Sequence, residues 1–325
     1  MTAPQNRSAA GIAFILAGMT AISINDMLIK QLAGGYPLHQ IVFTRSLIGL
    51  FFSLIMVHFE GGFEILKTRQ PGLHIARGAL VVLSNMTFFV ALAALPLADA
   101  TALFFVAPLF ITLLSIPILG EKVGPLRIGA VLVGFIGVIL MQRPWASAEA
   151  LGADRLILLL PVIAAFAYAA MQLLTRKLGA TTKASALAVY IQATFVFVSV
   201  VFYLVAGDGR FAEGLESPSL VFLLRAWVWP AESDWLLFLG LGVNSAIIGY
   251  CLSAAYKLAD AATIAPYEYI LLPLAVFWGW LLWAELPVPV VWAGMGLIIG
   301  SGLFVFFREQ QKARTVARTE VKARY

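Results

Sequence analysis

The chain has 325 residues, of which 61% are hydrophobic and 12% charged, and its mean hydropathy is +0.92. A soluble domain usually carries about 25% charged residues, so this composition excludes a soluble protein and indicates an integral membrane protein. The net charge of +5 comes from loops and the tail, which argues against nucleic-acid binding, and the single cysteine, Cys251, excludes an internal disulfide and a cysteine-based zinc site.

Ten apolar stretches follow one another along the chain, each long enough to cross the roughly 30 Å hydrocarbon layer as a helix. The first could pass for a signal peptide, but because nine further spans follow it we interpret it as an uncleaved helix. The predicted spans are residues 9–32, 39–59, 73–95, 98–119, 124–142, 156–175, 184–206, 235–257, 260–284 and 287–307.

Most connections are short, and the exception is the segment 207–234. It contains the apolar run Leu220–Trp229, which is too short to span a membrane. Because this run carries Arg225, Trp227 and Trp229, we expect a helix in the membrane interface, and the alternative is an ordinary aromatic belt anchor.

The positions of lysine and arginine predict the orientation. If the N-terminus is cytoplasmic, sixteen of these residues fall on the cytoplasmic side, including six in the tail, and only Arg143, Arg155, Arg210 and Arg225 fall outside. The positive-inside rule then places both termini in the cytoplasm. The predicted organisation is a cytoplasmic N-terminus 1–8, a first repeat 9–142, a second repeat 156–307 containing the external loop 207–234, and a basic tail 308–325.

One pattern occurs twice along the chain. In each copy an apolar helix contains a proline, a glutamate follows, and a glycine-rich apolar segment comes next. The first copy has Ala100–Phe110 with Pro108, then Glu121 and Gly129–Leu140, and the second has Ala265–Ala275 with Pro273, then Glu285 and Gly294–Val305. Five spans per half is an odd number, so the second half must enter the membrane from the opposite side. Inverted repeats of this kind are typical of secondary transporters, which bind substrate between the halves.

These two copies resemble the EamA-type ten-helix members of the drug/metabolite transporter superfamily, and the resemblance extends over about residues 11–307. It implies an all-α integral membrane protein, with ten transmembrane helices in two inverted five-helix repeats around a central cavity, and alternating access. The second copy departs from the family pattern because Ala284 stands where Gly120 stands in the first and because it has an additional Pro266.

Charged residues inside spans are functional candidates, because each costs roughly 2.5–3.5 kcal/mol at the bilayer centre on insertion scales. Asp26 and Lys30 are four residues apart on one helix face, so we predict an internal ion pair that Arg45 could join; alternatively, Lys30 extends toward the headgroups. Glu268, beside Pro266, is a candidate proton carrier, and its alternative is a structural hydrogen bond to another helix.

Amides and aromatic rings inside spans are candidates for substrate binding, although each could instead hold helices together. The predicted substrate-binding residues are Asn25, Asn85, Phe89, Phe105, Tyr168, Gln172, Asn244, Tyr250 and Tyr267. Gln192 is a further amide inside a span. Pro108 and Pro273 are predicted to kink their helices and to act as hinges. Gly296 with Gly300, and Ala130 with Gly134, have the spacing of close helix contacts.

Enzyme motifs are absent from the sequence: there is no H-E-x-x-H, P-loop or G-x-S-x-G pattern, and we expect no cofactor and no metal. The sequence therefore favours a secondary active transporter of a small organic metabolite, with an aromatic or heterocyclic one preferred, such as a riboflavin-like vitamin, S-adenosylmethionine or an amino acid. The alternatives are a membrane enzyme and a membrane scaffold or receptor. The expected partners are the substrate, membrane lipid and protons, with no nucleic acid, in an inner-membrane monomer or homodimer.

Overall fold

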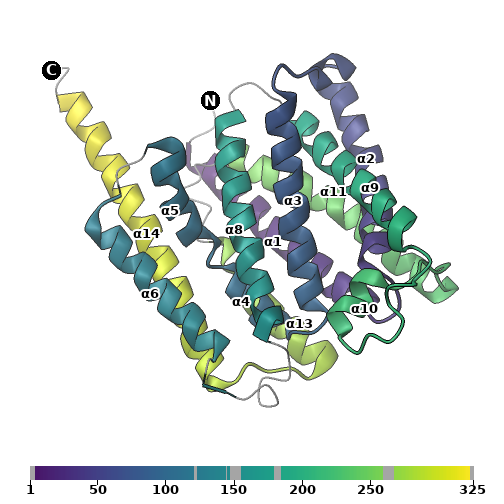
Figure 1. Ribbon diagram of the computed structural model, residues 1–325. Helices are drawn as coiled ribbons and strands as arrows, with labels where there is room; N and C mark the ends of the chain where they lie inside the picture. Colours follow the sequence, from purple (N-terminus) through teal and green to yellow (C-terminus); the bar gives the residue numbers. More distant parts are fainter. Residues whose placement is uncertain are drawn as a thin grey trace.

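The computed structural model describes residues 4–120, 123–143, 145–146, 155–178, 184–258 and 267–322. Within these ranges the chain forms helices and turns and has no strand (Figure 1). The α-helices are α1 Pro4–Leu32, α2 Leu38–Glu60, α3 Pro71–Leu92, α4 Leu97–Phe104, α5 Ala107–Leu119, α6 Pro125–Gln142, α8 Arg155–Leu178, α9 Ala184–Ala206, α10 Pro218–Leu224, α11 Trp235–Leu258, α13 Leu271–Trp283 and α14 Pro289–Lys322, with short 3₁₀ helices at Phe63–Leu66 and Glu232–Asp234.

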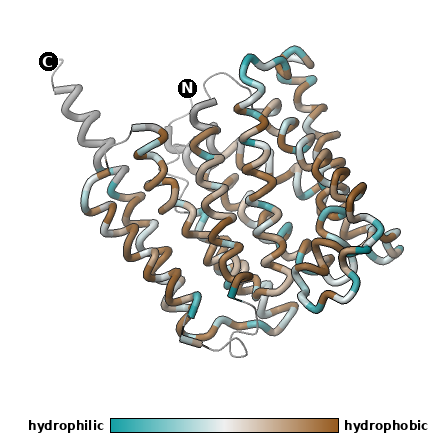
Figure 2. The backbone as a smooth tube through the Cα atoms, viewed as in Figure 1, coloured by the Kyte–Doolittle hydropathy of each residue, from teal (hydrophilic) through white to brown (hydrophobic). Residues whose placement is uncertain are grey.

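Eight stretches of the described residues are long and apolar enough to cross a membrane, and two shorter apolar helices, Ile128–Gln142 and Leu271–Trp283, accompany them. Apolar residues cover the helical walls of the bundle, whereas polar residues gather at the helix ends (Figure 2). Large hydrophobic side chains such as Phe51, Leu132 and Phe197 are exposed on those walls, as expected where lipid is the solvent. The chain is therefore a multi-pass membrane protein, and the all-α prediction is confirmed.

The two halves of the chain pack against each other through equivalent pairs of helices. Helix α1, the first of its half, packs against α11, and its counterpart α8 packs against α3. The remaining counterparts pair with each other, α2 with α9 and α6 with α14. This pairing is what a twofold relation between two repeats produces. Both chain ends lie on one side of the bundle, here called the terminus side, and α10 lies on the opposite side, called the loop side (Figure 1).

The predicted span 98–119 is not one continuous helix, because it breaks between α4 and α5 at Phe105 and Val106. Pro108 has no N–H to donate to the Phe104 carbonyl. Its ring would also clash with that carbonyl oxygen in a regular helix, so the helix is interrupted before the proline. In the second half, a turn at Tyr269 and Ile270 precedes α13, again just before a proline. Residues 259–266, which include the predicted start of that span and Pro266, lie outside the described ranges.

Close backbone contact joins α6 and α14, the last helices of the two halves. A Cβ atom added to Gly137 would lie 2.8 Å from the Gly294 carbonyl oxygen, and one added to Gly294 would lie 2.8 Å from the Gly137 oxygen. Gly134 also faces α14, as its spacing predicts. Gly296 and Gly300 do not take part, since nothing lies within 4 Å of a Cβ added to either, so the predicted contact motif on α14 is wrong for packing within the chain.

The segment 207–234 packs on the protein at the loop side, which corrects the prediction of a ten-residue interfacial helix. Its one α-helix is Pro218–Leu224, which ends before Trp227 and Trp229, and Phe222 is 1% exposed. The Tyr36 hydroxyl donates to Asp234 Oδ2 at 2.6 Å and accepts from the Ala231 N–H. Burial, followed by this hydrogen bond to a carboxylate, raises the pKa of Tyr36. The segment thus ties the turn after α1 to the second half of the chain.

Candidate transport site

A cavity of about 410 Å³ lies between α1, α2, α9 and α11, in the terminus-side half of the bundle. Small side chains at helical spacing, such as Gly49 and Ser53 of α2 and Ser245 and Gly249 of α11, leave this space open. The lining also includes Glu60 of α2, Ser185, Ala188 and Gln192 of α9, and Tyr250 of α11. Where α2 ends and α9 begins, Ser185 Oγ donates to Glu60 Oε2 at 2.7 Å. The volume suits a small organic molecule, since such sites usually measure about 300–1,000 Å³.

A polar cluster of Asn25, Asp26 and Arg45 lies beyond the inner end of this cavity. Arg45 is one helical turn from the cavity-lining Gly49 and therefore on the same face of α2. Its Nη1 donates to Asn25 Oδ1 at 3.4 Å, and Asn25 Nδ2 donates to Asp26 Oδ1 at 3.1 Å. All three residues are buried, with at most 7% of each exposed. The sequence prediction placed these residues inside spans, and the structure brings them together.

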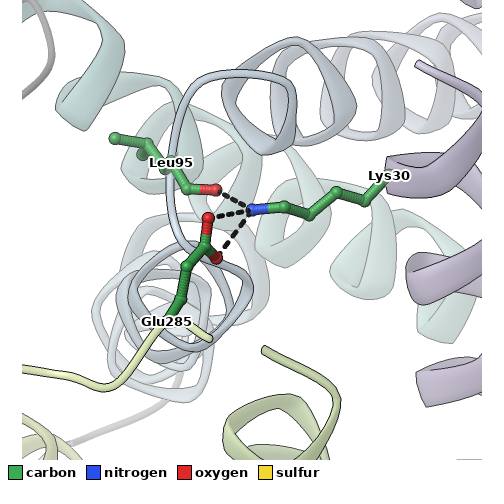
Figure 3. A network of polar contacts seen from close by, with 3 residues as sticks. All are labelled: Lys30, Leu95 and Glu285. Carbon is green, nitrogen blue, oxygen red and sulfur yellow. Dashed lines mark hydrogen bonds and ion pairs between the residues drawn. The ribbon is translucent and has the colours of Figure 1, made fainter. Parts of the chain in front are cut away.

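Lys30 does not pair with Asp26, so that part of the predicted ion pair is wrong. Its ammonium lies 3.0 Å from Glu285 Oε2 and donates to the Leu95 carbonyl at 2.7 Å (Figure 3). The physical reason is the direction of the Lys30 side chain. Lys30 is in the last turn of α1, and its side chain extends toward the loop-side ends of other helices, whereas Asp26 lies one turn deeper in the bundle. The Trp283 ring centroid, 5.0 Å from the Lys30 nitrogen, adds a cation–π contact.

This ionic contact joins the two halves of the chain on the loop side. Lys30 comes from the first half and Glu285 from the connection between α13 and α14, and their side chains are 9% and 31% exposed. Asp99, at the start of α4, adds a second buried carboxylate whose charge acts on Lys30. A second cavity of about 390 Å³ lies on the loop-side surface of this contact, lined in part by Lys30, Arg225 and Glu285.

The two helix breaks meet inside the bundle. The rings of Phe105 and Tyr269 stack, with centroids 5.0 Å apart and planes inclined by 27°. Phe105 precedes Pro108 by three residues, and Tyr269 precedes Pro273 by four. Aromatic pairs of this kind add roughly 0.5–1.5 kcal/mol beyond their buried area. The predicted hinges, Pro108 and Pro273, thus each lie within about one helical turn of this contact between the two halves.

The other predicted substrate-binding residues are dispersed. Asn85 donates to the Val81 carbonyl of its own helix, and Asn244 donates to the Ala21 carbonyl of α1 at 2.7 Å, which joins two helices. Gln172 Nε2 donates to the Tyr168 hydroxyl at 2.6 Å. None of these four residues is among those that line the two cavities described here.

Aromatic candidates fall into different places as well. Tyr250 lines the terminus-side cavity and is 56% exposed, and Phe89 faces the Arg45 guanidinium at 5.5 Å. Tyr267 is 38% exposed and stands at the edge of the described residues. Glu268 follows it, is partly buried, and its charge acts on the hydroxyls of Tyr168 and Tyr269.

Sequence reasoning missed Glu285 and Glu60 as members of polar contacts. Glu285 was noted only as part of the repeated pattern and not as a site residue, yet it is the ionic partner of Lys30. The sequence signal that could have identified Glu285 is its position in the repeat. It follows Ala284, a helix C-cap in the left-handed conformation, just as Glu121 follows the left-handed C-cap Gly120. Glu121 itself lies outside the described residues. Phe195 carried no sequence signal, because its role comes from the approach of α9 to Arg45.

Comparisons with known proteins agree with this architecture. Residues 9–143 match the EamA-like transporter family. A riboflavin transporter of Rhizobium johnstonii is 30% identical over 308 residues, covering 95% of this chain and 92% of that protein. An S-adenosylmethionine uptake transporter of Rickettsia prowazekii is 26% identical, covering 93% and 94% of the two chains. One solved crystal structure has the same fold, with a TM-score of 0.59 and 21% identity over 89% of this chain and 95% of the other.

The extent of these matches decides the family. The Rhizobium relative aligns over nearly the full length of both proteins, so the likeness is not confined to one repeat. These relatives are membrane transporters of metabolites and not enzymes, which agrees with the absence of enzyme motifs in the sequence. The chain belongs to the EamA-like transporter family and is a membrane metabolite transporter with ten transmembrane helices in two inverted five-helix repeats.

Proposed function

We propose that this protein is a secondary active transporter of a small heterocyclic metabolite in a bacterial inner membrane, with riboflavin as the first candidate substrate. The observation that carries the proposal is the asymmetry of the bundle. A cavity of about 410 Å³ occupies the terminus-side half, whereas the Lys30–Glu285 contact joins the halves on the loop side. The names of the relatives, riboflavin transporter and S-adenosylmethionine uptake transporter, support a substrate with a fused heteroaromatic ring.

Alternating access is the proposed mechanism. The arrangement described here would be the state open on the terminus side. To reach the other state, Lys30 would release Glu285, and the two halves would rock about the Phe105–Tyr269 contact near the middle of the bundle. Asp26 and Glu268 are the candidate proton carriers for coupling, because each is a carboxylate within or beside an apolar span.

The proposed orientation has both termini in the cytoplasm, so the open cavity would face the cytoplasm. The excess of lysine and arginine on the terminus side supports it. Labelling from outside intact cells with an impermeant maleimide checks it: a cysteine at Gly214 should react and one at Lys312 should not. The reverse labelling pattern would show that both termini lie outside the cell.

Uptake by the purified protein tests the substrate. Proteoliposomes loaded with buffer should accumulate labelled riboflavin with saturable kinetics, and unlabelled riboflavin added well above the KM should compete with the labelled compound. Labelled S-adenosylmethionine, assayed in parallel, distinguishes the two substrates named for the relatives. Proteoliposomes that take up neither compound faster than protein-free liposomes, with or without a pH gradient, would contradict the proposal.

The proline breaks should control the rate of this cycle. Pro108→Ala and Pro273→Ala each restore an N–H that can donate to the carbonyl four residues earlier, so the helix can straighten. We expect initial uptake to fall by roughly three- to tenfold with normal amounts of protein in the membrane. Pro161→Ala is the matched control, because Pro161 lies inside α8, which continues without a break. Equal rates in all three variants would remove the prolines from the mechanism.

A further inference from the structure

The guanidinium of Arg45 is buried without enough partners. Arg45 is 7% exposed, and its Nε has no hydrogen-bond partner among the described residues. The hydrogen bond that the structure does give it, from Nη1 to Asn25 Oδ1, is long at 3.4 Å. A guanidinium carries five N–H donors, and buried donors are nearly always paired because leaving one unmade is costly. The unpaired Nε of Arg45, next to a weakly bonded Nη1, therefore calls for an acceptor from outside the chain.

The position of Arg45 relative to the cavity identifies where that acceptor would come from. On α2 the cavity-lining Gly49 is one turn away on the same face. On α9 the cavity-lining Gln192 is three residues from Phe195, whose ring centroid lies 5.5 Å from Arg45 Cζ. Phe89 of α3 lies at the same distance. Arg45 and the two rings thus lie just beyond the inner end of the cavity and are not among its lining residues, so a molecule that entered about one helical turn deeper would meet them.

The charge around Arg45 limits the kind of acceptor. Asn25 bridges the guanidinium and the Asp26 carboxylate, so the cluster already contains one negative group for the one positive group. An additional anion is not required for neutrality. A planar guanidinium instead matches two adjacent acceptor atoms on one edge of a neutral molecule, and the rings of Phe89 and Phe195 provide apolar contacts for a flat body.

We propose that Arg45 determines substrate specificity by donating two hydrogen bonds to the carbonyl-bearing edge of a flat, uncharged heterocycle bound at the inner end of the terminus-side cavity. This inference rests on the proposed transport of a heterocyclic metabolite and adds which edge of the substrate is recognised and by which residue. Asn25 acts as a positioning residue, because its amide holds Arg45 and Asp26 in place.

Binding of two tricyclic probes to the purified full-length protein tests the proposal. Lumichrome has a flat ring system with a carbonyl edge, and phenazine has a flat ring system of similar size with no carbonyl. Wild-type protein should bind lumichrome at least about tenfold more tightly than phenazine, because a bidentate contact of an arginine is lost with phenazine. Arg45→Lys keeps the charge but not the planar fork, so it should weaken lumichrome binding by roughly tenfold and leave phenazine binding unchanged.

Arg210→Gln is the matched control, since Arg210 is 60% exposed on the loop side and should leave both affinities unchanged. Equal wild-type affinity for the two probes, or no binding of either, would overturn the proposal even if Arg45→Lys failed to fold. Loss of both affinities in a folded Arg45→Lys variant would also overturn it, because a general packing role would then be sufficient. A protein that transports no riboflavin yet shows the expected probe pattern would refute the proposed substrate and leave the Arg45 assignment standing.

Discussion

Reversing either charge of the Lys30–Glu285 pair should reduce riboflavin uptake by about tenfold or more, because each change puts two like charges across the repeat boundary where the native charged atoms are 3.0 Å apart. The side chains are 9% and 31% exposed, so solvent screens this pair less than a surface pair. In either single variant, the two like charges at positions 30 and 285 would repel each other, and the loop side could not close. Initial uptake rates in proteoliposomes, corrected for the amount of protein, measure the effect.

The double exchange Lys30→Glu with Glu285→Lys separates an ionic contact from two independent roles. It restores opposite charges, and we expect uptake to recover to within a few-fold of wild type. The pair formed by Lys67 and Glu64 is a matched control, because its atoms are also 3.0 Å apart but its side chains are 78% and 81% exposed. Exchanging that pair should leave uptake unchanged. A double variant as inactive as the single ones would contradict the proposed closure of the loop side.

The spans could be predicted from sequence because lipid imposes a simple rule. A helix that crosses the hydrocarbon layer must be long and apolar, so composition and length alone placed α1 over 9–32 and α9 over 184–206. The inverted arrangement also followed from sequence, since an odd number of spans per repeat forces the second half to enter from the other side. The break before Pro108 was predicted only as a kink, because the sequence does not say whether neighbouring contacts will keep the helix continuous.

The polar contacts could be predicted only in part, because they depend on which helices become neighbours. Asp26 and Lys30 lie four residues apart, and a pair between them is favourable in an isolated helix. In the bundle, Glu285 and the Leu95 carbonyl reach Lys30 instead, although Glu285 is far away along the chain. The cavity was hidden for the same reason. Its walls are mostly small residues on several helices, and the sequence marked Tyr250 and Gln192 without showing that they face the same space.

Adding a single methyl group to Gly137 should destabilise the protein more than any comparable change on the surface of α6. The new Cβ would lie 2.8 Å from the Gly294 carbonyl oxygen and 3.0 Å from side-chain atoms of Leu297 and Ile298. A backbone oxygen cannot move without shifting α14, and interiors packed this closely do not absorb such an overlap. Overpacking costs typically about 1–3 kcal/mol, so we expect Gly137→Ala to lower the melting temperature by roughly 5 °C.

Two glycines supply controls for this prediction. Gly129 lies in α6 and Gly296 in α14, and a Cβ added to either meets nothing within 4 Å. Alanine at these positions should leave the melting temperature in detergent unchanged or slightly raised, because alanine favours helices more than glycine does. Gly294→Ala should behave like Gly137→Ala, since its Cβ would meet the Gly137 oxygen and the Met141 side chain. If all four variants had the same melting temperature, close backbone contact would not be what holds α6 and α14 together.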